Sequence, residues 1–171
     1  MLIEEFKLIS VIIPCFNSGK ILKRAVDSVL KQTWPKIEII LVNDGSNDLH
    51  TLEIFQYCKK VSNLNLINQD NLGLSAARNN GVKYANGEYL FFLDSDDWIE
   101  PELLEMMVKV LLKNNDKVFV FSDIILEGDI NMTIEKKYNF FEQLFINQLP
   151  YSILISKEKW LLNGGYDAEM M

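Results

Sequence analysis

Cysteine and histidine are scarce in this chain, which limits the metal and disulfide chemistry open to it. Two of the 171 residues are cysteines, Cys15 and Cys58, and one is a histidine, His50. The two cysteines lack the spacing of a disulfide framework or a zinc site, so we expect a reducing, cytoplasmic setting. His50 lies near the start of a predicted helix without a partner, and we assign it no role.

Basic residues and long hydrophobic runs are also in short supply. Lysine and arginine number 17 against 24 aspartate and glutamate residues, which gives a formal net charge of -7. This balance argues against a nucleic-acid-binding protein, whereas a small phosphorylated ligand stays compatible because a metal ion can reverse the local charge. We expect the N-terminal residues not to act as a signal peptide and no segment of the sequence to cross a membrane as a helix.

Hydrophobic patterns predict strands that alternate with helices along a single domain, residues 1–171. The predicted strands cover residues 7–13, 37–42, 64–68 and 88–94, and the predicted helices cover 21–30, 51–60, 72–85 and 101–113. Pro101 is expected at the first position of the last of these helices. Further elements are a strand at 117–126 with a hairpin partner at 131–137, a helix at 139–147, a strand at 151–156 and a helical turn at 157–162.

This alternation predicts an α/β fold with a mostly parallel central sheet flanked by helices and a mixed C-terminal part. In such sheets, ligands bind outside the carboxyl ends of the strands. The segments "PCFN", "NDGS" and "DSDD" follow the first, second and fourth predicted strands. We therefore expect these three segments to meet at one edge of the sheet.

The "DSDD" segment contains a candidate metal site. Side chains at positions i and i+2 of an extended backbone point the same way, so Asp94 and Asp96 can converge on one cation while Ser95 faces elsewhere. Carboxylate oxygens suit Mg²⁺ or Mn²⁺. Alternatively, these acids form turns and cap the helix near Pro101. The hydrophobic "YLFFL" before them places the acids at the end of a buried strand and favours the metal site.

Two further residues are candidates for ligand recognition. Asp44 in "VNDGS" has the position to accept hydrogen bonds from the N–H edge of a nucleotide base. Arg78 lies in the predicted helix "LSAARNNG", whose small side chains allow close approach to the sheet or to a ligand. Taken alone, each has a simpler interpretation, a plain turn for Asp44 and an exposed arginine for Arg78.

Four segments in this order, "SVIIPCFN", "IEIILVNDGSND", "NLGLSAARNNG" and "YLFFLDSDDWIEP", resemble the family 2 glycosyltransferases of the GT-A fold. The later "GGYD" resembles a further landmark of that family. The resemblance implies that Asp94 and Asp96 bind a divalent cation, Mn²⁺ or Mg²⁺, which bridges the diphosphate of the donor. It further implies that the donor nucleotide is bound by Pro14, Phe16, Asn17, Asp44, Arg78 and Ser95. Asp97, from its place in "DSDD", is a candidate for an indirect contact with the metal or for binding the donor sugar.

The implied reaction is transfer of a sugar, with inversion, from a nucleotide-sugar, most commonly a UDP-sugar, to a hydroxyl of a saccharide or lipid-linked saccharide. In the family the general base belongs to an acidic pair beyond the "GG(F/Y)D" landmark. The chain ends at Met171 without a match to that pair, so we expect a domain truncated before the acceptor region and assign no catalytic base. The expected location is cytoplasmic, with the inner face of the membrane as an alternative.

Other functions remain as alternatives. A non-catalytic nucleotide-sugar-binding module or an inactive truncated remnant would share the donor-binding residues and lack the base. A phosphatase with an Asp-x-Asp pair, or a receiver domain, is disfavoured because those proteins place key acids after the first strand, which here ends in "PCFN". A dinucleotide-dependent oxidoreductase is disfavoured because no Gly-x-Gly-x-x-Gly follows that strand.

Overall fold

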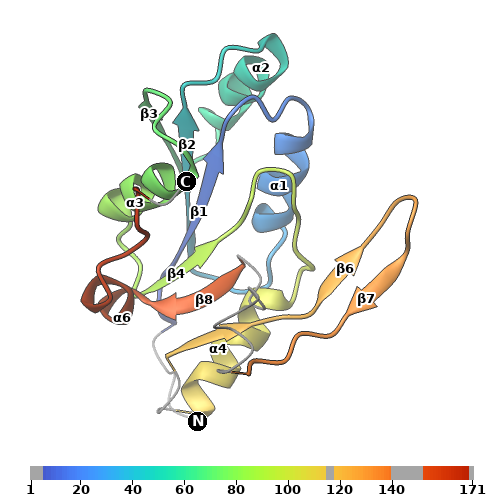
Figure 1. The fold of residues 1–171 in the computed structure, drawn as a ribbon, viewed down its shortest axis with the longest axis vertical. Coiled ribbons are helices and arrows are strands. Elements are labelled where there is room, and N and C mark those ends of the chain that lie inside the picture. The colour runs from blue at the N-terminus through green and yellow to red at the C-terminus, as the bar shows by residue number, and fades with distance from the viewer. Residues whose placement is uncertain (1–5, 115–117, 140–151, 170–171) are drawn as a thin grey trace.

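The computed structural model describes residues 6–114, 118–139 and 152–169. Its centre is a six-stranded sheet with the strand order β3-β2-β1-β4-β8-β5. Helices pack on both faces of this sheet (Figure 1). The prediction of an α/β fold with a mostly parallel central sheet flanked by helices is confirmed.

Four parallel strands make up the first part of the sheet. These are β1 (Ile9–Cys15), β2 (Ile37–Asp44), β3 (Leu64–Gln69) and β4 (Tyr89–Phe92). The connecting helices are α1 (Ile21–Leu30), α2 (Leu49–Cys58) and α3 (Leu74–Tyr84). Strand β1 pairs with both β2 and β4, and every one of its residues is buried, as expected for a hydrophobic central strand.

The second part of the sheet is mixed. Helix α4 (Leu103–Lys113) leads to the short strand β5 (Phe119–Phe121), and β8 (Ile153–Ser156) lies antiparallel between β4 and β5. Strands β6 (Ile124–Leu126) and β7 (Met132–Ile134) form a separate antiparallel hairpin that extends away from the central sheet (Figure 1). Helix α6 (Lys157–Leu162) follows β8 directly.

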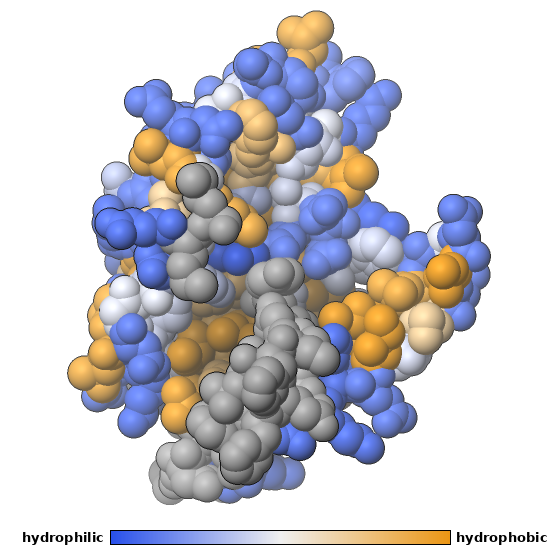
Figure 2. Space-filling model, in the orientation of Figure 1, coloured by the Kyte–Doolittle hydropathy of each residue, from blue (hydrophilic) through white to orange (hydrophobic). Residues whose placement is uncertain are grey.

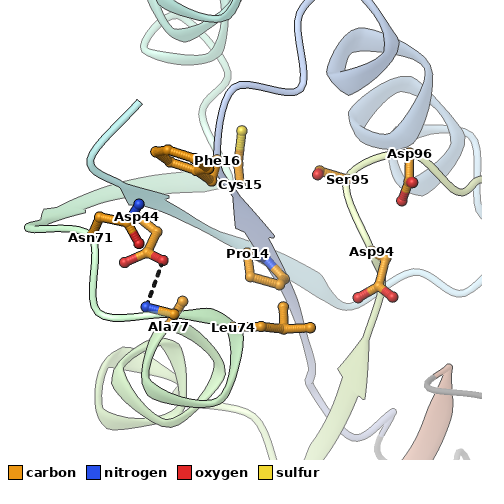
Figure 3. Close-up of a pocket in the computed structure, with 11 residues that line it drawn as sticks. Pro14, Cys15, Phe16, Asp44, Asn71, Leu74, Ala77, Asp94, Ser95 and Asp96 are labelled. Atoms are coloured by element: carbon orange, nitrogen blue, oxygen red, sulfur yellow. Dashed lines mark hydrogen bonds between the residues drawn. The ribbon is translucent and has the colours of Figure 1, made fainter. Parts of the chain in front are cut away.

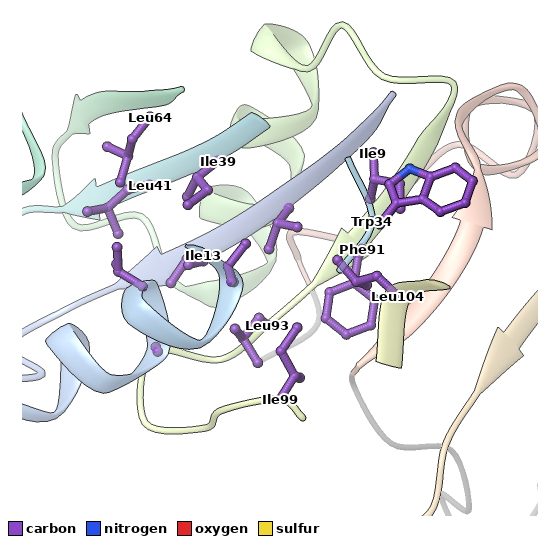
Figure 4. Packing of buried hydrophobic residues seen from close by; sticks show 14 of the residues in the cluster. Ile9, Ile13, Trp34, Ile39, Leu41, Leu64, Phe91, Leu93, Ile99 and Leu104 are labelled. Atoms are coloured by element: carbon purple, nitrogen blue, oxygen red, sulfur yellow. The ribbon is translucent and has the colours of Figure 1, made fainter. Parts of the chain in front are cut away.

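The hydrophobic core has two parts because successive residues of a strand point to opposite faces of the sheet. Ile9, Val11 and Ile13 of β1 pack on one side with residues of α1, α2 and α4 (Figure 4). Ile12 packs on the other side, against the layer that contains α3. This alternation fixes which face of the sheet each helix covers.

Gly81 allows α3 to lie unusually close to the sheet. A β-carbon at this position would come within 2.6 Å of Ile12 Cγ2 and 3.1 Å of Val42 Cγ2. The expectation that small side chains bring this helix close to the sheet is therefore met at a specific point of contact.

Several boundaries differ from the sequence prediction. The predicted strand 117–126 is wrong as one element, since β5 and β6 belong to different sheets. Pro101 is not the first helical residue, because α4 begins at Leu103, after a turn in which the Leu103 N–H donates to Glu100 O. Strand β1 continues through Pro14 to Cys15, beyond the predicted end at residue 13. The predicted helix at 139–147 lies almost entirely outside the described residues.

Within the described ranges, no helix combines the length and the apolar composition that crossing a bilayer requires.

Candidate functional site

A cleft of about 400 Å³ lies at the carboxyl end of the parallel strands. Figure 3 shows Asp44 on one side of it, Asp94 and Asp96 on the other, and Pro14 between them. The three segments expected to meet at this edge, which follow β1, β2 and β4, therefore do meet. The lining residues come from the ends of β1, β2 and β4, from the loop before α3 and from α3 itself. They are Pro14, Cys15, Phe16, Asp44, Asn71, Gly73, Leu74, Ala77, Asp94, Ser95 and Asp96.

The Asp44 carboxylate, at the end of β2, organises the loop that precedes α3. Its Oδ1 accepts hydrogen bonds from Gln69 Nε2 and from the Leu72 N–H, both at 2.8 Å. Its Oδ2 accepts one from the Gly73 N–H at 3.0 Å. A carboxylate offers about four acceptor positions. One position, on Oδ2, thus remains for a donor in the cleft, although the residue itself is only 4% exposed.

Arg78 of α3 is buried and binds the first aspartate of the "DSDD" segment. Its Nη2 donates to Asp94 Oδ1, and the guanidinium also lies over the Tyr166 ring, 5.1 Å from the ring centre. The Asp94 side chain is 22% exposed and lines the cleft. Arg78 therefore balances the charge of Asp94 from the α3 side, and part of the carboxylate stays open to the cleft.

Asp96 and Asp97 are exposed, and within the described part of the chain neither has an ion-pair partner. Desolvation by neighbouring groups, followed by the charges of Asp96 and Asp94, raises the pKa of the Asp97 carboxyl above its ordinary value. Because Asp97 is exposed, solvent screens part of this effect. The described residues contain no cluster of three or more His, Cys, Asp or Glu side chains placed to hold a metal ion. The segment thus carries more negative charge than Arg78 balances.

The loop after β1 is fixed by the loop after β2. Asn17 adopts a left-handed backbone conformation with φ of 50°. Its Oδ1 accepts hydrogen bonds from the N–H groups of Asn47 and Asp48, at 2.8 and 3.1 Å. In the same loop, the hydroxyls of Ser18 and Ser95 are 2.6 Å apart. These bonds join the loop after β1 to the loop after β2 and to the "DSDD" segment.

The structure brings together six of the nine residues predicted to bind donor or metal, namely Pro14, Phe16, Asp44, Asp94, Ser95 and Asp96. The other three lie around the cleft without lining it: Asn17 holds two loops together, Arg78 lies beneath Asp94, and Asp97 faces away. The roles predicted for all nine remain predictions.

Sequence reasoning missed Cys15 and four residues of the β3–α3 region, which also line the cleft. The sequence does carry a signal for these four residues, since they lie in the segment "NLGLSAARNNG", which also contains Arg78. These four residues are Asn71, Gly73, Leu74 and Ala77.

A mostly parallel sheet with an acidic cleft at its carboxyl edge is the architecture of the GT-A glycosyltransferases, and solved structures of that class are similar to this chain in fold. TarS 1-349 from S. aureus in complex with UDP-GlcNAc superimposes with a TM-score of 0.78 at 24% identity, over 93% of this chain and 48% of the TarS 1-349 chain. The mannosyltransferase PcManGT from Pyrobaculum calidifontis, in complex with GDP-Man and Mn²⁺, has a TM-score of 0.75 at 19% identity, over 97% of this chain and 49% of PcManGT. At these identities the likeness shows the fold.

The family follows from the sequence. Residues 10–165 match the model of glycosyl transferase family 2, and the chain belongs to this family. Glycosyltransferase GlyA of Streptococcus pneumoniae is 40% identical over 117 residues, which is 66% of this chain and 16% of GlyA. Chondroitin synthase of Pasteurella multocida is 36% identical over 123 residues, 70% of this chain and 12% of the synthase. The chain thus spans a small part of the length of these relatives.

Proposed function

We propose that the cleft binds the nucleotide-sugar donor of an inverting, metal-dependent glycosyltransferase. The observation that carries the proposal is that Asp44, Asp94 and Asp96, from two separate strand ends, line one cleft together with the exposed ring of Phe16. A base acceptor at one end and carboxylates at the other match the two ends of a nucleoside diphosphate. Membership of family 2 supports the same assignment.

The nucleoside end is assigned to Phe16 and Asp44. Phe16 is 49% exposed at the edge of the cleft and offers a face against which a base can stack. The remaining acceptor position of Asp44 Oδ2 suits an N–H group of uracil or guanine, which a base without such a group would leave unsatisfied. TarS and PcManGT were solved with a uracil and a guanine nucleotide-sugar, respectively. We assign a UDP-sugar as the donor.

The diphosphate end is assigned to Asp94 and Asp96 with one Mn²⁺ or Mg²⁺ ion. Three carboxylates line the cleft, and a diphosphate adds further negative charge, so binding requires a cation beyond Arg78. Magnesium commonly binds through one or two carboxylates together with substrate phosphates, which fits the two acids present. When bound, the ion would stabilise the negative charge of the departing nucleoside diphosphate.

The chain's own residues then orient the donor for transfer. Ser95, held by the Ser18 hydroxyl, lies between the two metal-binding acids and fixes their loop. Arg78 holds Asp94 in place from the α3 side. A hydroxyl oxygen of a saccharide or lipid-linked saccharide bonds to the anomeric carbon while the bond from that carbon to the diphosphate breaks, and the hydroxyl proton passes to a general base. We assign no general base to the described residues.

Binding of UDP, GDP and dTDP, measured by calorimetry with Mn²⁺ and with a chelator, tests the proposal. We expect UDP to bind only with Mn²⁺, and Asp96→Asn to lose this binding without loss of the fold. Asp129→Asn, in the exposed turn between β6 and β7, is the matched control and should bind as the wild type does. Equal UDP affinity with and without metal would contradict the assignment. Donor binding without transfer to any acceptor would favour the non-catalytic binding module.

A further inference from the structure

A second cleft, of about 670 Å³, lies between the segment that follows Asp96 and the β6–β7 hairpin. It shares no lining residue with the donor cleft, but the two are adjacent in the chain, since Asp96 lines the first and Asp97 lines the second. The loop that carries the acids assigned to the donor's diphosphate thus continues directly into the wall of the second cleft. Figure 1 shows the hairpin extending past the start of α4, which forms another wall.

We propose that this second cleft binds a saccharide without net negative charge, which accepts the sugar held in the donor cleft. The proposal rests on the donor function proposed above and adds the location and the charge class of the acceptor. Three features carry it: a fixed aromatic surface, hydroxyl groups on the facing wall, and a negative charge balance.

Trp98 supplies the aromatic surface. The Arg24 guanidinium lies 3.1 Å from the centre of the Trp98 ring, and Arg24 Nη2 is 3.2 Å from Glu127 Oε2. A cation over an aromatic ring and an ion pair beyond it restrict the indole to one orientation. Because Arg24 covers one face of the indole, the part of the ring that lines the cleft is the apolar surface against which we expect the C–H face of a sugar ring to pack.

The facing wall belongs to β6, β7 and the residues beside them. Ser122 and Thr133 contribute hydroxyl groups, and Ile124 and Ile125 contribute apolar surface. The hairpin is closed by the pairing of β6 with β7 and by a hydrogen bond from the Lys136 N–H to Asp123 Oδ1 at 2.8 Å. In Figure 2 hydrophobic side chains of this hairpin lie next to the body of the molecule. A mixture of apolar faces and hydroxyl groups matches a carbohydrate, which presents both.

The charge balance selects against anionic saccharides. The residues that line the cleft include one base, Lys136, and four acids, Asp97, Glu100, Asp123 and Glu127. One of these acids, Glu127, is paired with Arg24, and the others still outnumber the lysine. A uronate or phosphate group would be repelled here, whereas neutral hydroxyls can donate hydrogen bonds to the carboxylates.

Saturation-transfer NMR with two probes tests the proposal. The neutral probe is a tetrasaccharide of N-acetylglucosamine, and the anionic probe is a hyaluronan tetrasaccharide. We expect the neutral probe to bind, and the anionic probe to bind about tenfold more weakly at low salt, with the difference shrinking as salt screens the acids. Glu100→Lys should strengthen binding of the anionic probe while leaving the neutral one within about twofold.

Trp98 variants locate the binding. Trp98→Ala should weaken binding of the neutral probe by about two- to tenfold. Trp98→Phe, which keeps an aromatic face, should retain most of the wild-type affinity for that probe. UDP–Mn²⁺ affinity should be unchanged in both, which also shows that they fold. If UDP binds and the neutral tetrasaccharide does not, or if the anionic probe binds equally at low salt, this inference is overturned while the donor function stands. If UDP does not bind, the donor function itself fails.

Discussion

Asn79 on α3 holds the backbone of Tyr166 by two hydrogen bonds that span 87 positions of the chain. Its Nδ2 donates to Tyr166 O at 2.7 Å, and its Oδ1 accepts from the Tyr166 N–H at 2.9 Å. The Tyr166 ring packs edge-on against Phe92, with ring centres 5.3 Å apart, and lies under the Arg78 guanidinium. The "GGYD" segment is thereby fixed beneath the residue that binds Asp94.

Replacing Asn79 tests this connection. Asn79→Ala removes both hydrogen bonds and should lower the free energy of unfolding by about 1–3 kcal/mol. Hydrogen exchange of the Tyr166 amide should accelerate. Asn79→Asp keeps an acceptor for that amide and loses the donor to the carbonyl, so the amide should stay protected. Equal loss of protection in the two variants would show that the side-chain acceptor is not what holds Tyr166.

The Arg78–Asp94 pair should behave as a coupled unit. Arg78→Met leaves the half-buried Asp94 carboxylate without its cation. The loss in free energy of unfolding should be smaller than the roughly 3–5 kcal/mol seen when fully buried pairs are broken, because the Asp94 side chain is 22% exposed. Adding Asp94→Asn removes the stranded charge and should recover part of the loss. Urea denaturation of the two single variants and the double variant gives the coupling energy. Additive effects would contradict the pairing.

Gly81→Ala should destabilise the protein, although alanine normally favours a helix by roughly 0.5–1 kcal/mol over glycine. The added methyl group would meet Ile12 Cγ2 at 2.6 Å, so α3 or the sheet must shift. We expect a net loss of about 1–3 kcal/mol in thermal or urea denaturation. A gain in stability would show that α3 is not in close contact with β1.

The buried thiol of Cys58 should make stability fall at high pH. Burial, followed by the charges of Cys15 and Asp27, raises the pKa of this thiol to about 11 from an ordinary value of 9.0. The stability that comes from keeping the thiol protonated is complete below about pH 9 and is lost as the pH rises toward about 11.

Urea denaturation of the wild type and of Cys58→Ala, compared from pH 8 to pH 11, measures this contribution. The wild type should lose more stability over that range than the variant, in which the other titrating groups remain. Parallel pH profiles would contradict the raised pKa.

Local patterns predicted most of the central sheet because each of its strands carries its own signal. "SVII" and "IEIILV" are β-branched runs flanked by turn residues, and they form β1 and β2 close to the predicted boundaries. The prediction of one strand over 117–126 was wrong because a continuous apolar run can be divided between two sheets. Where the first strand ends depends on which strands lie beside it in the folded chain. The residues after this run pair with β6, and so confirm the predicted hairpin.

The candidate site was predictable in its list of residues more than in its contacts. Acids at the ends of parallel strands predict a cleft, since the carboxyl ends of these strands lie at the same edge of the sheet. The hydrogen-bond partner of each acid is distant in sequence. Asp44 accepts from the backbone N–H groups of residues 72 and 73, and Asp94 accepts from Arg78, a helix residue 16 positions earlier. Hydrogen-bond partners of this kind depend on how α3 packs on the sheet.

By itself, the sequence determined the parallel α/β order, the sheet edge at which the strand-end acids meet, and the family, because hydrophobic periodicity and strand-end motifs are local. Only the tertiary structure decided that Arg78 neutralises Asp94, that Asn79 holds Tyr166, and that the β6–β7 hairpin builds a second cleft beside Trp98. Each of these depends on distances between segments far apart in the chain, which packing sets and residue order does not record.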